Sequence, residues 1–418
     1  MKKILITGGA GFIGSEIVKQ LDAIGGYEVL VMDCMTRQIH GDNWEQSYLY
    51  KTIKDKCHFI KADIRDYDAV CKTVSGVDCV IHLAAETGTG QSMYQINQYN
   101  EVNIMGTSNL MQAISSLGQK NTVKKIILSS SRSVYGEGKY SCPQCGIVYP
   151  NSRTKEKMLD GDFNMYCACC HSKLSLVPTT EDSEVKPSSL YAYTKYAQEK
   201  MLQTMCPALG VDYTIFRFQN VYGVGQSLKN PYTGILSIFS TLMLENKPIN
   251  IFENGKESRD FINVKDIAAG VIASIDNPRS NGEIVNLGSG EATSVIEIAD
   301  ILKVIYGSNS DIKVTGDFRI GDVAHNKADI TKAKEILGFK QTISLKDGLS
   351  AFCKWVMGED KDNSGYEKSL SNLVSRHISA TFRPSLYNFV TNSHFLRLNV
   401  ICSSKVVSNF RGSHQRKG

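Results

Sequence analysis

The apolar residues of this chain recur in two patterns that alternate along it. Residues 3–7 form a short continuous apolar run, and residues 15–21 carry apolar positions at helical spacing. Further short apolar runs follow at 28–32, 58–63, 79–85, 125–131 and 211–216. Strands that are apolar on both faces lie buried between helices, as in parallel sheets. The pattern therefore predicts an α/β fold with a doubly wound parallel sheet.

Longer stretches with helical spacing complete the predicted elements. Residues 97–117 and 191–202 predict two helices, and residues 266–275 predict a third that returns to the sheet. Asn220, which follows the strand at 211–216, begins a smaller second lobe. Near the C-terminus, residues 370–382 predict one amphipathic helix.

The bulk composition is that of a globular protein. The 418 residues are 42% hydrophobic and 21% charged, and no apolar run approaches the ~20 residues that span a bilayer. The chain enters its first strand at Lys3 without a charged-then-apolar leader. We therefore expect a cytoplasmic protein without a transmembrane segment.

The net charge of +5 comes from one end of the chain. Residues 362–418 hold eight Lys or Arg and two Asp or Glu, whereas residues 1–361 hold 39 and 40. The body of the protein therefore gives no electrostatic basis for nucleic-acid binding. The basic end is a disordered tail, a peripheral anchor on anionic lipid or a non-native extension, and we expect a poorly ordered tail over 358–418.

A glycine-rich turn joins the first strand to the first helix. Gly8, Gly11 and Gly14 let the backbone turn sharply and approach a pyrophosphate at the helix N-terminus. Asp33 ends the second strand, 19 residues after Gly14, where its carboxylate can accept from both ribose hydroxyls of NAD. The same carboxylate would repel the 2′-phosphate of NADP. Strand, glycines, helix, strand and acid in this order predict an NAD-binding site.

Two later strands end in residues that would line the same cofactor. The strand at 58–63 ends at the adenine position, and the strand at 79–85 ends in small residues where the cofactor would pass close. His82, in the latter strand, is expected to be a buried structural histidine rather than a catalytic one. The residues predicted to line the cofactor here are Asp63, Ile64, Leu83, Ala84 and Ala85.

The catalytic candidates are Tyr191 and Lys195. Residues four apart share one face of a helix, so this spacing holds the phenol and the ammonium side by side. A free phenol titrates near pH ~10, and a fixed cation beside it lowers that pKa. Such a pair can take a proton from a sugar hydroxyl while the carbon loses hydride. The strand at 125–131 delivers a cluster of hydroxyls, including that of Ser131, to the edge of the sheet where ligands bind.

In combination, these motifs resemble the extended short-chain dehydrogenase/reductases, which are NAD-dependent nucleotide-sugar epimerases and dehydratases. The resemblance runs from residue 1 to about residue 355. The stretches that carry it are 8–14, Asp63, 82–85, 129–136, 191–195, 217–223, 255–266, 286–290 and 319–329.

The resemblance implies a domain organisation and a set of site residues. It implies an NAD-binding Rossmann domain over 1–136, 187–220 and 260–285, a nucleotide-sugar lobe over 221–259 and 286–357, and a homodimer. Ser131 would hydrogen-bond the reacting oxygen, and Lys195 would hold the nicotinamide ribose. The other residues that it assigns are Phe12, Ile13 and Asn103 to the cofactor, and Asn220, Arg259 and Arg319 to the nucleotide sugar.

Residues 137–186 depart from the common family pattern. They contain two Cys-x-x-Cys turns separated by 21 residues, and each turn can supply two thiolates to a tetrahedral zinc. This pattern predicts a zinc-ribbon-like insertion, and the alternative is a loop with reduced, unmetallated thiols. Cys169 and His171 are surplus, so the ligands of the second turn stay open. The predicted zinc ligands are Cys142, Cys145, Cys167 and Cys170.

Arg132 and Ser133 occupy the positions that separate the reactions of the family. Dehydratases place an Asp and a Glu there, because eliminating the C6 hydroxyl needs an acid and a base. The resemblance therefore implies 4-epimerisation through a transient 4-keto sugar, and with the insertion the chain is most similar to dTDP-L-rhamnose 4-epimerase-like members. The alternatives are an epimerase of UDP-sugars, a net oxidoreductase or dehydratase, and a non-catalytic NAD-binding scaffold.

Overall fold

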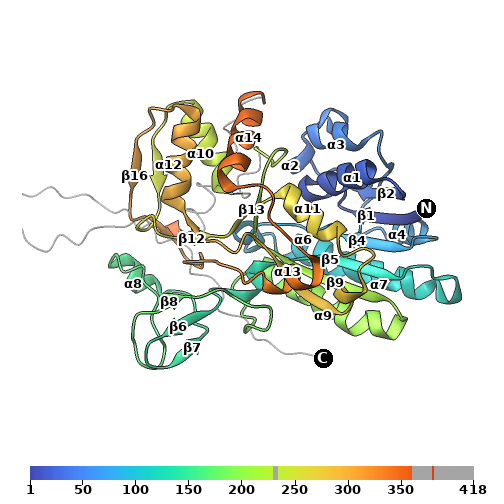
Figure 1. Ribbon diagram of the computed structural model, residues 1–418, viewed down its shortest axis with the longest axis horizontal. Helices are drawn as coiled ribbons and strands as arrows, with labels where there is room; N and C mark the ends of the chain where they lie inside the picture. The colour runs from blue at the N-terminus through green and yellow to red at the C-terminus, as the bar shows by residue number, and fades with distance from the viewer. Residues whose placement is uncertain (229–233, 360–378, 381–418) are drawn as a thin grey trace, which may run out of the picture. The chain divides into compact units, whose positions relative to one another are not determined.

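The computed structural model describes residues 1–228, 234–359 and 379–380 (Figure 1). Within these residues, seven strands form one parallel sheet. They are β1 (Lys2–Thr7), β2 (Tyr27–Asp33), β3 (His58–Lys61), β4 (Cys79–His82), β5 (Lys125–Ser131), β9 (Asp212–Phe218) and β14 (Glu283–Leu287). Their order is β14-β9-β5-β4-β1-β2-β3, so the direction of the crossovers reverses between β1 and β4. The predicted doubly wound sheet is confirmed, and this switch point is where such sheets bind ligands.

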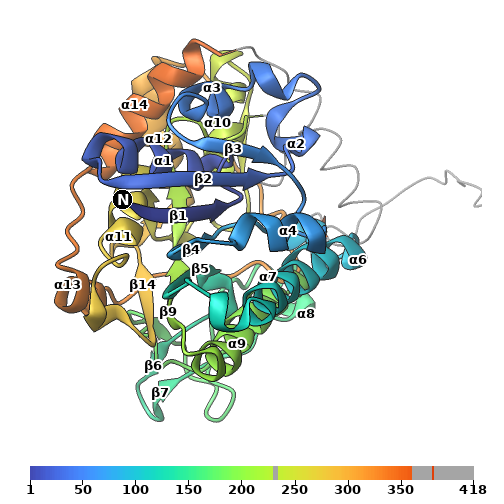
Figure 2. The same ribbon diagram turned by 90° about the vertical axis from the view of Figure 1, so that its right-hand side faces the viewer.

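The strand residues alternate between two apolar cores, one on each face of the sheet. In β1, Ile4 and Ile6 belong to one core and Leu5 to the other, and all three are fully buried. Burial on both faces explains why the strands read as continuous apolar runs. The covering helices (Figure 2) are α1 (Phe12–Ile24) and α11 (Val264–Ile272) on the first core, and α4 (Tyr67–Val74), α7 (Gly106–Ser116) and α9 (Leu190–Leu209) on the second.

The helix expected over residues 97–117 is confirmed as one unbroken helical stretch, but its middle part is not α-helical. Three elements follow one another there: α6 (Ile96–Tyr99), a π-helical segment (Asn100–Met105) and α7. Wider π-helical turns inside helices often place a side chain for a specific contact. Here the segment contains Asn103, whose contacts belong to the site described below.

The helix that carries Tyr191 extends beyond its predicted end. α9 continues to Leu209, whereas the apolar spacing indicated an end at residue 202. Ser189 caps its N-terminus by accepting a hydrogen bond from the Ala192 N–H at 3.2 Å, and Gly210 ends it in the left-handed conformation. α11 begins two residues earlier and ends three residues earlier than the predicted range of 266–275.

The smaller lobe has its own apolar core, in which Leu302, Leu349 and Phe352 are fully buried. Its main elements are α10 (Ile235–Leu244), β11 (Ile249–Ile251), α12 (Val295–Tyr306), β16 (Ile312–Val314) and α14 (Leu345–Met357). Short pairs of strands complete it: β10 (Asn220–Tyr222) with β13 (Phe261–Asn263), β12 (Ser258–Arg259) with β15 (Thr293–Ser294), and β17 (Phe318–Arg319) with β18 (Ser379–Ala380).

The insertion forms a small antiparallel sheet in the order β7-β6-β8, with β6 (Tyr140–Cys142), β7 (Gly146–Val148) and β8 (Ser175–Leu176), and a helix, α8 (Lys155–Leu159). It lies apart from the central sheet, below β12 in the view of Figure 1. Its apolar core includes Ala324 of the lobe. Thr179, beyond β8, donates its N–H to the Lys327 carbonyl at 2.8 Å and accepts from the Asp329 N–H at 2.9 Å. The insertion is therefore docked on the segment that follows β17.

Shorter elements of the structure are α2 (Arg37–His40), α3 (Tyr48–Ile53), α5 (Thr89–Ser92) and α13 (Thr331–Leu337). Of the amphipathic helix expected over 370–382, only residues 379–380 are described, and they form β18 instead of a helix. The rest of the predicted tail, from residue 360 on, lies outside the described residues. Within the described ranges, every helix is too short or too polar to cross a bilayer.

Candidate active site

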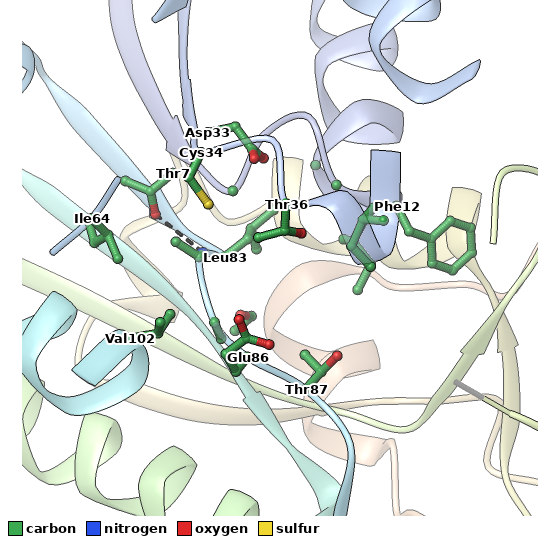
Figure 3. A pocket seen from close by; sticks show the side chains of 18 of the residues that line it. Thr7, Phe12, Asp33, Cys34, Thr36, Ile64, Leu83, Glu86, Thr87 and Val102 are labelled. Carbon is green, nitrogen blue, oxygen red and sulfur yellow. Dashed lines mark hydrogen bonds between the residues drawn. The ribbon is translucent and has the colours of Figure 1, made fainter. Parts of the chain in front are cut away.

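A cavity of about 670 Å³ opens at the carboxyl ends of β1, β2, β4 and β5. This volume lies in the range of small-molecule and cofactor sites. Thr7, Asp33, Leu83 and Glu86 are among the side chains around it in Figure 3. The sequence-predicted residues that line it are Gly8, Gly11, Phe12, Ile13, Gly14, Asp33, Asp63, Ile64, Leu83, Ala84, Ala85, Ser131, Tyr191, Lys195 and Asn220.

The three predicted glycines have different reasons to be glycine. Gly8 has φ of 69°, and a Cβ there would lie 2.7 Å from the Ala84 nitrogen. A Cβ at Gly14 would lie 2.6 Å from the Gly8 carbonyl oxygen, so the helix can approach the turn only without a side chain. Gly11 is the N-cap of α1 and lines the cavity. The first turn of α1 therefore points its N–H groups at a place suited to a pyrophosphate.

The two predicted acids lie at the ends of β2 and β3. Asp33 accepts from the Ala10 N–H at 3.1 Å and from the Met35 N–H at 2.9 Å, which fixes the carboxylate beside the glycine turn. Burial raises the pKa of Asp33. Asp63 forms an ion pair with Arg65 at 2.7 Å. Burial acts against ionisation of Asp63, but its hydrogen bonds with Arg65 outweigh burial and lower its pKa.

Tyr191, Ser131 and Lys195 meet at the inner end of the cavity. Ser131 ends β5 and lines the cavity near the Tyr191 phenol, and Lys195 follows Tyr191 one turn later on α9, 2% exposed. Burial raises the pKa of Tyr191, whereas Ser131 and the Arg132 guanidinium act to lower it. The expectation that Lys195 also lowers this pKa stays a prediction. Burial lowers the pKa of Lys195 itself to about 7, with Glu199 acting in the opposite direction.

A buried ion pair lies behind this group. Arg217 on β9 donates to Glu199 on α9 at 2.8 Å and lies over the Tyr135 ring, 4.6 Å from its centre. Glu199 also accepts from the Ser130 hydroxyl, next to Ser131. The network joins β5, β9 and α9, so it fixes the serine strand against the tyrosine helix.

His82 and Asn103 have structural contacts. His82 bonds the Thr7 hydroxyl through Nδ1 at 2.7 Å and the Thr107 hydroxyl through Nε2 at 3.0 Å, and burial lowers its pKa to about 3. Asn103 accepts from the Glu86 N–H at 2.7 Å. Its side-chain nitrogen donates to the Glu86 carbonyl oxygen at 3.1 Å and to the Thr194 hydroxyl at 2.9 Å. Asn103 thus lies behind the cavity lining, where it holds the chain after β4 against α9.

Of the three lobe residues predicted for the nucleotide sugar, the structure places one in the lining of the main cavity. Asn220 lines the cavity, and its buried Oδ1 has no hydrogen-bond partner. Arg259 donates to the Ser258 carbonyl at 2.9 Å and to the Ala324 carbonyl at 3.2 Å. Arg319 lies over the Phe252 ring, 5.0 Å from its centre, and its buried Nε has no partner. Neither arginine is part of the lining of the main cavity.

Arg132 lies between these two groups. Its Nη1 is buried without a partner. Burial and the neighbouring Arg259 lower its pKa to about 10, while Asp322, Glu137 and Tyr191 act to raise it. The same guanidinium therefore interacts with the predicted base and with a predicted phosphate-binding residue.

Comparison with known proteins identifies this arrangement. The model of the NAD dependent epimerase/dehydratase family matches residues 4–155 and 164–288. The chain belongs to this family. The unmatched gap between these two ranges, residues 156–163, falls inside the insertion.

Relatives within the family include several 4-epimerases. The chain is 37% identical to dTDP-L-rhamnose 4-epimerase of Burkholderia thailandensis, over 87% of this chain and 97% of that protein. Its structure is similar to UDP-glucuronic acid 4-epimerase of Bacillus cereus in complex with UDP-glucuronic acid and NAD, with TM-score 0.69 and 27% identity. It is also similar to UDP-glucose 4-epimerase of Thermotoga maritima with UDP-glucose, with TM-score 0.68 and 28% identity. Each likeness covers 85% of this chain and 99% of the other.

The insertion brings four cysteines together. The Sγ atoms of these residues all lie within 4.8 Å of one another, and the Cys145 N–H points to the Cys142 sulfur at 3.4 Å. Gly146 and His171, directly after the two turns, have φ of 73° and 60°, so the chain reverses in the same way at both. Exposed Cys169 is outside the cluster, which is Cys142, Cys145, Cys167 and Cys170.

Sequence reasoning missed several lining residues. Thr7 ends β1 and could have been inferred from that position alone. Glu86 and Thr87 follow the small residues that end β4, in a loop that has no motif of its own. Gln219 directly follows β9, and Gln226 follows β10, in a segment that reaches the cavity only through the tertiary fold.

Proposed function

We propose that the protein is an NAD-dependent nucleotide-sugar 4-epimerase that acts through a transient 4-keto sugar. The observation that carries the proposal is that Ser131, Tyr191 and Lys195 line one cavity together with the glycine turn and Asp33. The absence of carboxylates at positions 132 and 133 supports epimerisation over dehydration.

The residues around the cavity fit NAD. The glycine turn leaves space at the N-terminus of α1, and the Asp33 carboxylate is fixed at the end of β2 for the ribose hydroxyls. When bound, NAD supplies a hydride acceptor that returns the hydride within the same turnover. Residues proposed to hold it are Gly8, Gly11, Phe12, Ile13, Gly14, Asp33, Asp63, Ile64, Leu83, Ala84, Ala85 and Lys195.

In the proposed mechanism, Tyr191 removes the proton from the C4 hydroxyl as hydride leaves C4. Ser131 donates a hydrogen bond to the same oxygen and so positions it. Lys195 and Arg132 supply positive charge near the phenolate. After the 4-keto sugar turns, Tyr191 returns the proton as hydride reaches the other face of the ring. Atoms and charge balance over the cycle, because no proton or hydride is lost.

The substrate that we propose is dTDP-L-rhamnose, with its C4 epimer dTDP-6-deoxy-L-talose as product. The identity to the Burkholderia thailandensis enzyme supports this choice. Asn220, Arg259 and Arg319 are proposed to hold the nucleotide sugar, since guanidinium pairs bidentately with phosphate oxygens. UDP-sugar epimerisation is the second candidate, which the likeness to the Bacillus cereus and Thermotoga maritima enzymes favours.

We also propose a structural zinc in the insertion. Four sulfurs around a tetrahedral zinc are ~3.8 Å apart at the usual Zn–S distance of ~2.3 Å. The cysteine cluster is close to this geometry, with all sulfurs within 4.8 Å. Four thiolates leave no open position for water, so such a metal would fix the fold of the insertion. The domain boundaries given above, a homodimer and a cytoplasmic location stay predictions.

Incubation with dTDP-, UDP- and GDP-sugars, followed by separation of C4 epimers, tests the function. We expect interconversion of dTDP-L-rhamnose and its C4 epimer without added cofactor. A net oxidoreductase would instead accumulate NADH in proportion to product. Absence of any epimer across the panel, from protein that retains NAD, would contradict the proposal and leave the non-catalytic scaffold.

A further inference from the structure

Arg153, in the insertion, makes contacts that no part of the proposed mechanism uses. Its side chain is 3% exposed and forms an ion pair with Glu253 of the lobe, which is 4% exposed. Nη2 donates to Glu253 Oε1 and to the Asp322 carbonyl oxygen, both at 2.9 Å. Nη1 donates to the other Glu253 oxygen and lies 3.5 Å from the Phe163 carbonyl oxygen. We call this set of contacts the Arg153 bridge.

The two lobe partners of the bridge flank the pair formed by Phe252 and Arg319. Glu253 directly follows Phe252 in the sequence. Asp322 is three residues after Arg319 and donates its N–H to the Arg319 carbonyl at 3.3 Å. The Arg319 guanidinium rests on the Phe252 ring. The Glu253 N–H also donates to the Asp317 carbonyl at 2.7 Å, so the two segments are already adjacent. Arg153 closes them into one unit from the side of the insertion.

The backbone of Glu253 adopts a conformation that is unfavourable by itself. Glu253 has φ of 52°, in the left-handed region that disfavours residues with a Cβ. The charge-assisted hydrogen bonds between the Glu253 carboxylate and Arg153 offset the free-energy cost of this conformation. Arg153 also lines a second cavity of about 230 Å³ between insertion and lobe, but not the main cavity. It is therefore placed to act on Arg319 without touching cofactor or sugar.

We propose that Arg153 is a positioning residue, through which the insertion sets the Phe252–Arg319 pair for the diphosphate of the substrate. The proposal rests on the proposed function, which assigns Arg319 to the diphosphate. A planar guanidinium is suited to the role, since it can bond a carboxylate and a carbonyl at the same time, whereas an ammonium has no such fixed fork. The bridge also gives the insertion a defined task near the active site.

The test compares Arg153→Met, Arg153→Lys and the double variant Arg153→Met/Glu253→Leu, each in the full chain. For Arg153→Met, we expect Kd for dTDP and KM for the sugar nucleotide to rise by about tenfold, as when one charge-assisted bond is misplaced. The value of kcat and the content of bound NAD should stay within a factor of about two to three. For Arg153→Lys, we expect a smaller rise in Kd and KM, again with kcat and bound NAD nearly unchanged.

The double variant separates positioning from simple stabilisation. Replacing both members of a buried ion pair with apolar groups often restores stability. The melting temperature should therefore recover, while the affinity for dTDP stays weak because the bond to Asp322 is not remade. If the affinity recovers together with the melting temperature, Arg153 has only a structural role and the proposal fails. Lys155→Met, an exposed charge loss two residues away, is the matched control and should change neither quantity.

Hydrogen exchange tests the bridge independently of any enzymatic activity. Backbone amides in residues 251–257 and 317–324 should exchange faster in Arg153→Met than in the wild type, and those in β1 and α1 should not. Unchanged exchange in both lobe segments would overturn the bridge even if the protein proves to be an epimerase. Faster exchange without epimerase activity would contradict the proposed function and leave the bridge in place.

Discussion

The phenol of Tyr191 is under opposing influences from its surroundings. Burial raises its pKa, and the groups that oppose burial are Ser131 and Arg132. Lys195 is the cation that the sequence assigned to this effect, and burial lowers its own pKa to about 7, because burial penalises the ammonium. The electrostatic environment of the base therefore also depends on Arg132, which the sequence analysis considered only as a position that separates the reactions of the family.

Replacing Tyr191 with Phe removes the proton acceptor and leaves the cofactor site intact. We expect kcat to fall by ~10² to 10⁴, the usual contribution of general base catalysis. Bound NAD should be unchanged, as measured on the purified protein. Activity within tenfold of the wild type would reject Tyr191 as the base.

Replacing Arg132 with Met should shift the pH dependence of kcat. Arg132 lowers the pKa of Tyr191, so its loss raises that pKa, and the limb of the profile that needs the phenolate moves to higher pH. Activity lost at neutral pH should return as the pH rises. Ser133→Ala is the control, since the N–H of residue 133 still donates to the Ser131 hydroxyl. A profile with an unchanged limb would show that Arg132 does not act on the phenol.

Asp33 should give the enzyme a preference for NAD over NADP. Its carboxylate is fixed by the Ala10 and Met35 N–H groups and cannot share its place with a phosphate dianion. We expect about a hundredfold difference in Kd by calorimetry, the result of like charges held together. Asp33→Asn should reduce the ratio of the Kd for NADP to the Kd for NAD. Equal affinities for NAD and NADP in the wild type would refute the assignment of Asp33 to the ribose hydroxyls.

At the scale of elements, the position of the insertion follows from where it leaves the chain. It separates β5, which ends at Ser131, from α9, which carries Tyr191, so both of its ends return to the active-site edge. Its small sheet shares an apolar core with Ala324, and Thr179 joins it to residues 327–329. A segment of this size buries little apolar surface by itself, and metal ligation can supply the missing folding free energy.

Replacing Cys142 and Cys145 with Ser should remove the metal and unfold the insertion. We expect one zinc per wild-type chain by elemental analysis and none in the variant, because structural zinc contributes ~10 kcal/mol or more to such folds. The affinity for the sugar nucleotide should weaken while NAD stays bound. Cys169→Ser, outside the cluster, should keep its zinc. A zinc content near zero in the wild type, with full activity in the variant, would refute the site.

At the scale of the whole molecule, the active site is a product of the order of the strands. The reversal between β1 and β4 opens the sheet where the glycine turn, Asp33 and the end of β4 face one cavity. The lobe contributes Asn220 from one side, and Arg259 and Arg319 lie on strands paired within it. The segment after β17 contacts both the insertion and Arg259, so the three parts of the chain converge there.

The sequence by itself determined the sheet, the glycine turn, the Tyr191/Lys195 spacing and the four-cysteine cluster. These features depend on local rules: apolar periodicity, the sterics of glycine, the helical repeat and the geometry of Cys-x-x-Cys turns. The tertiary structure decided the π-helical segment around Asn103, the charge that acts on Tyr191 and the Arg153 bridge. Each of these depends on contacts between residues distant in sequence, such as Asn103 with Thr194 and Arg153 with Glu253. Burial and Coulomb interactions depend on distance in space, so no pattern along the chain reveals them.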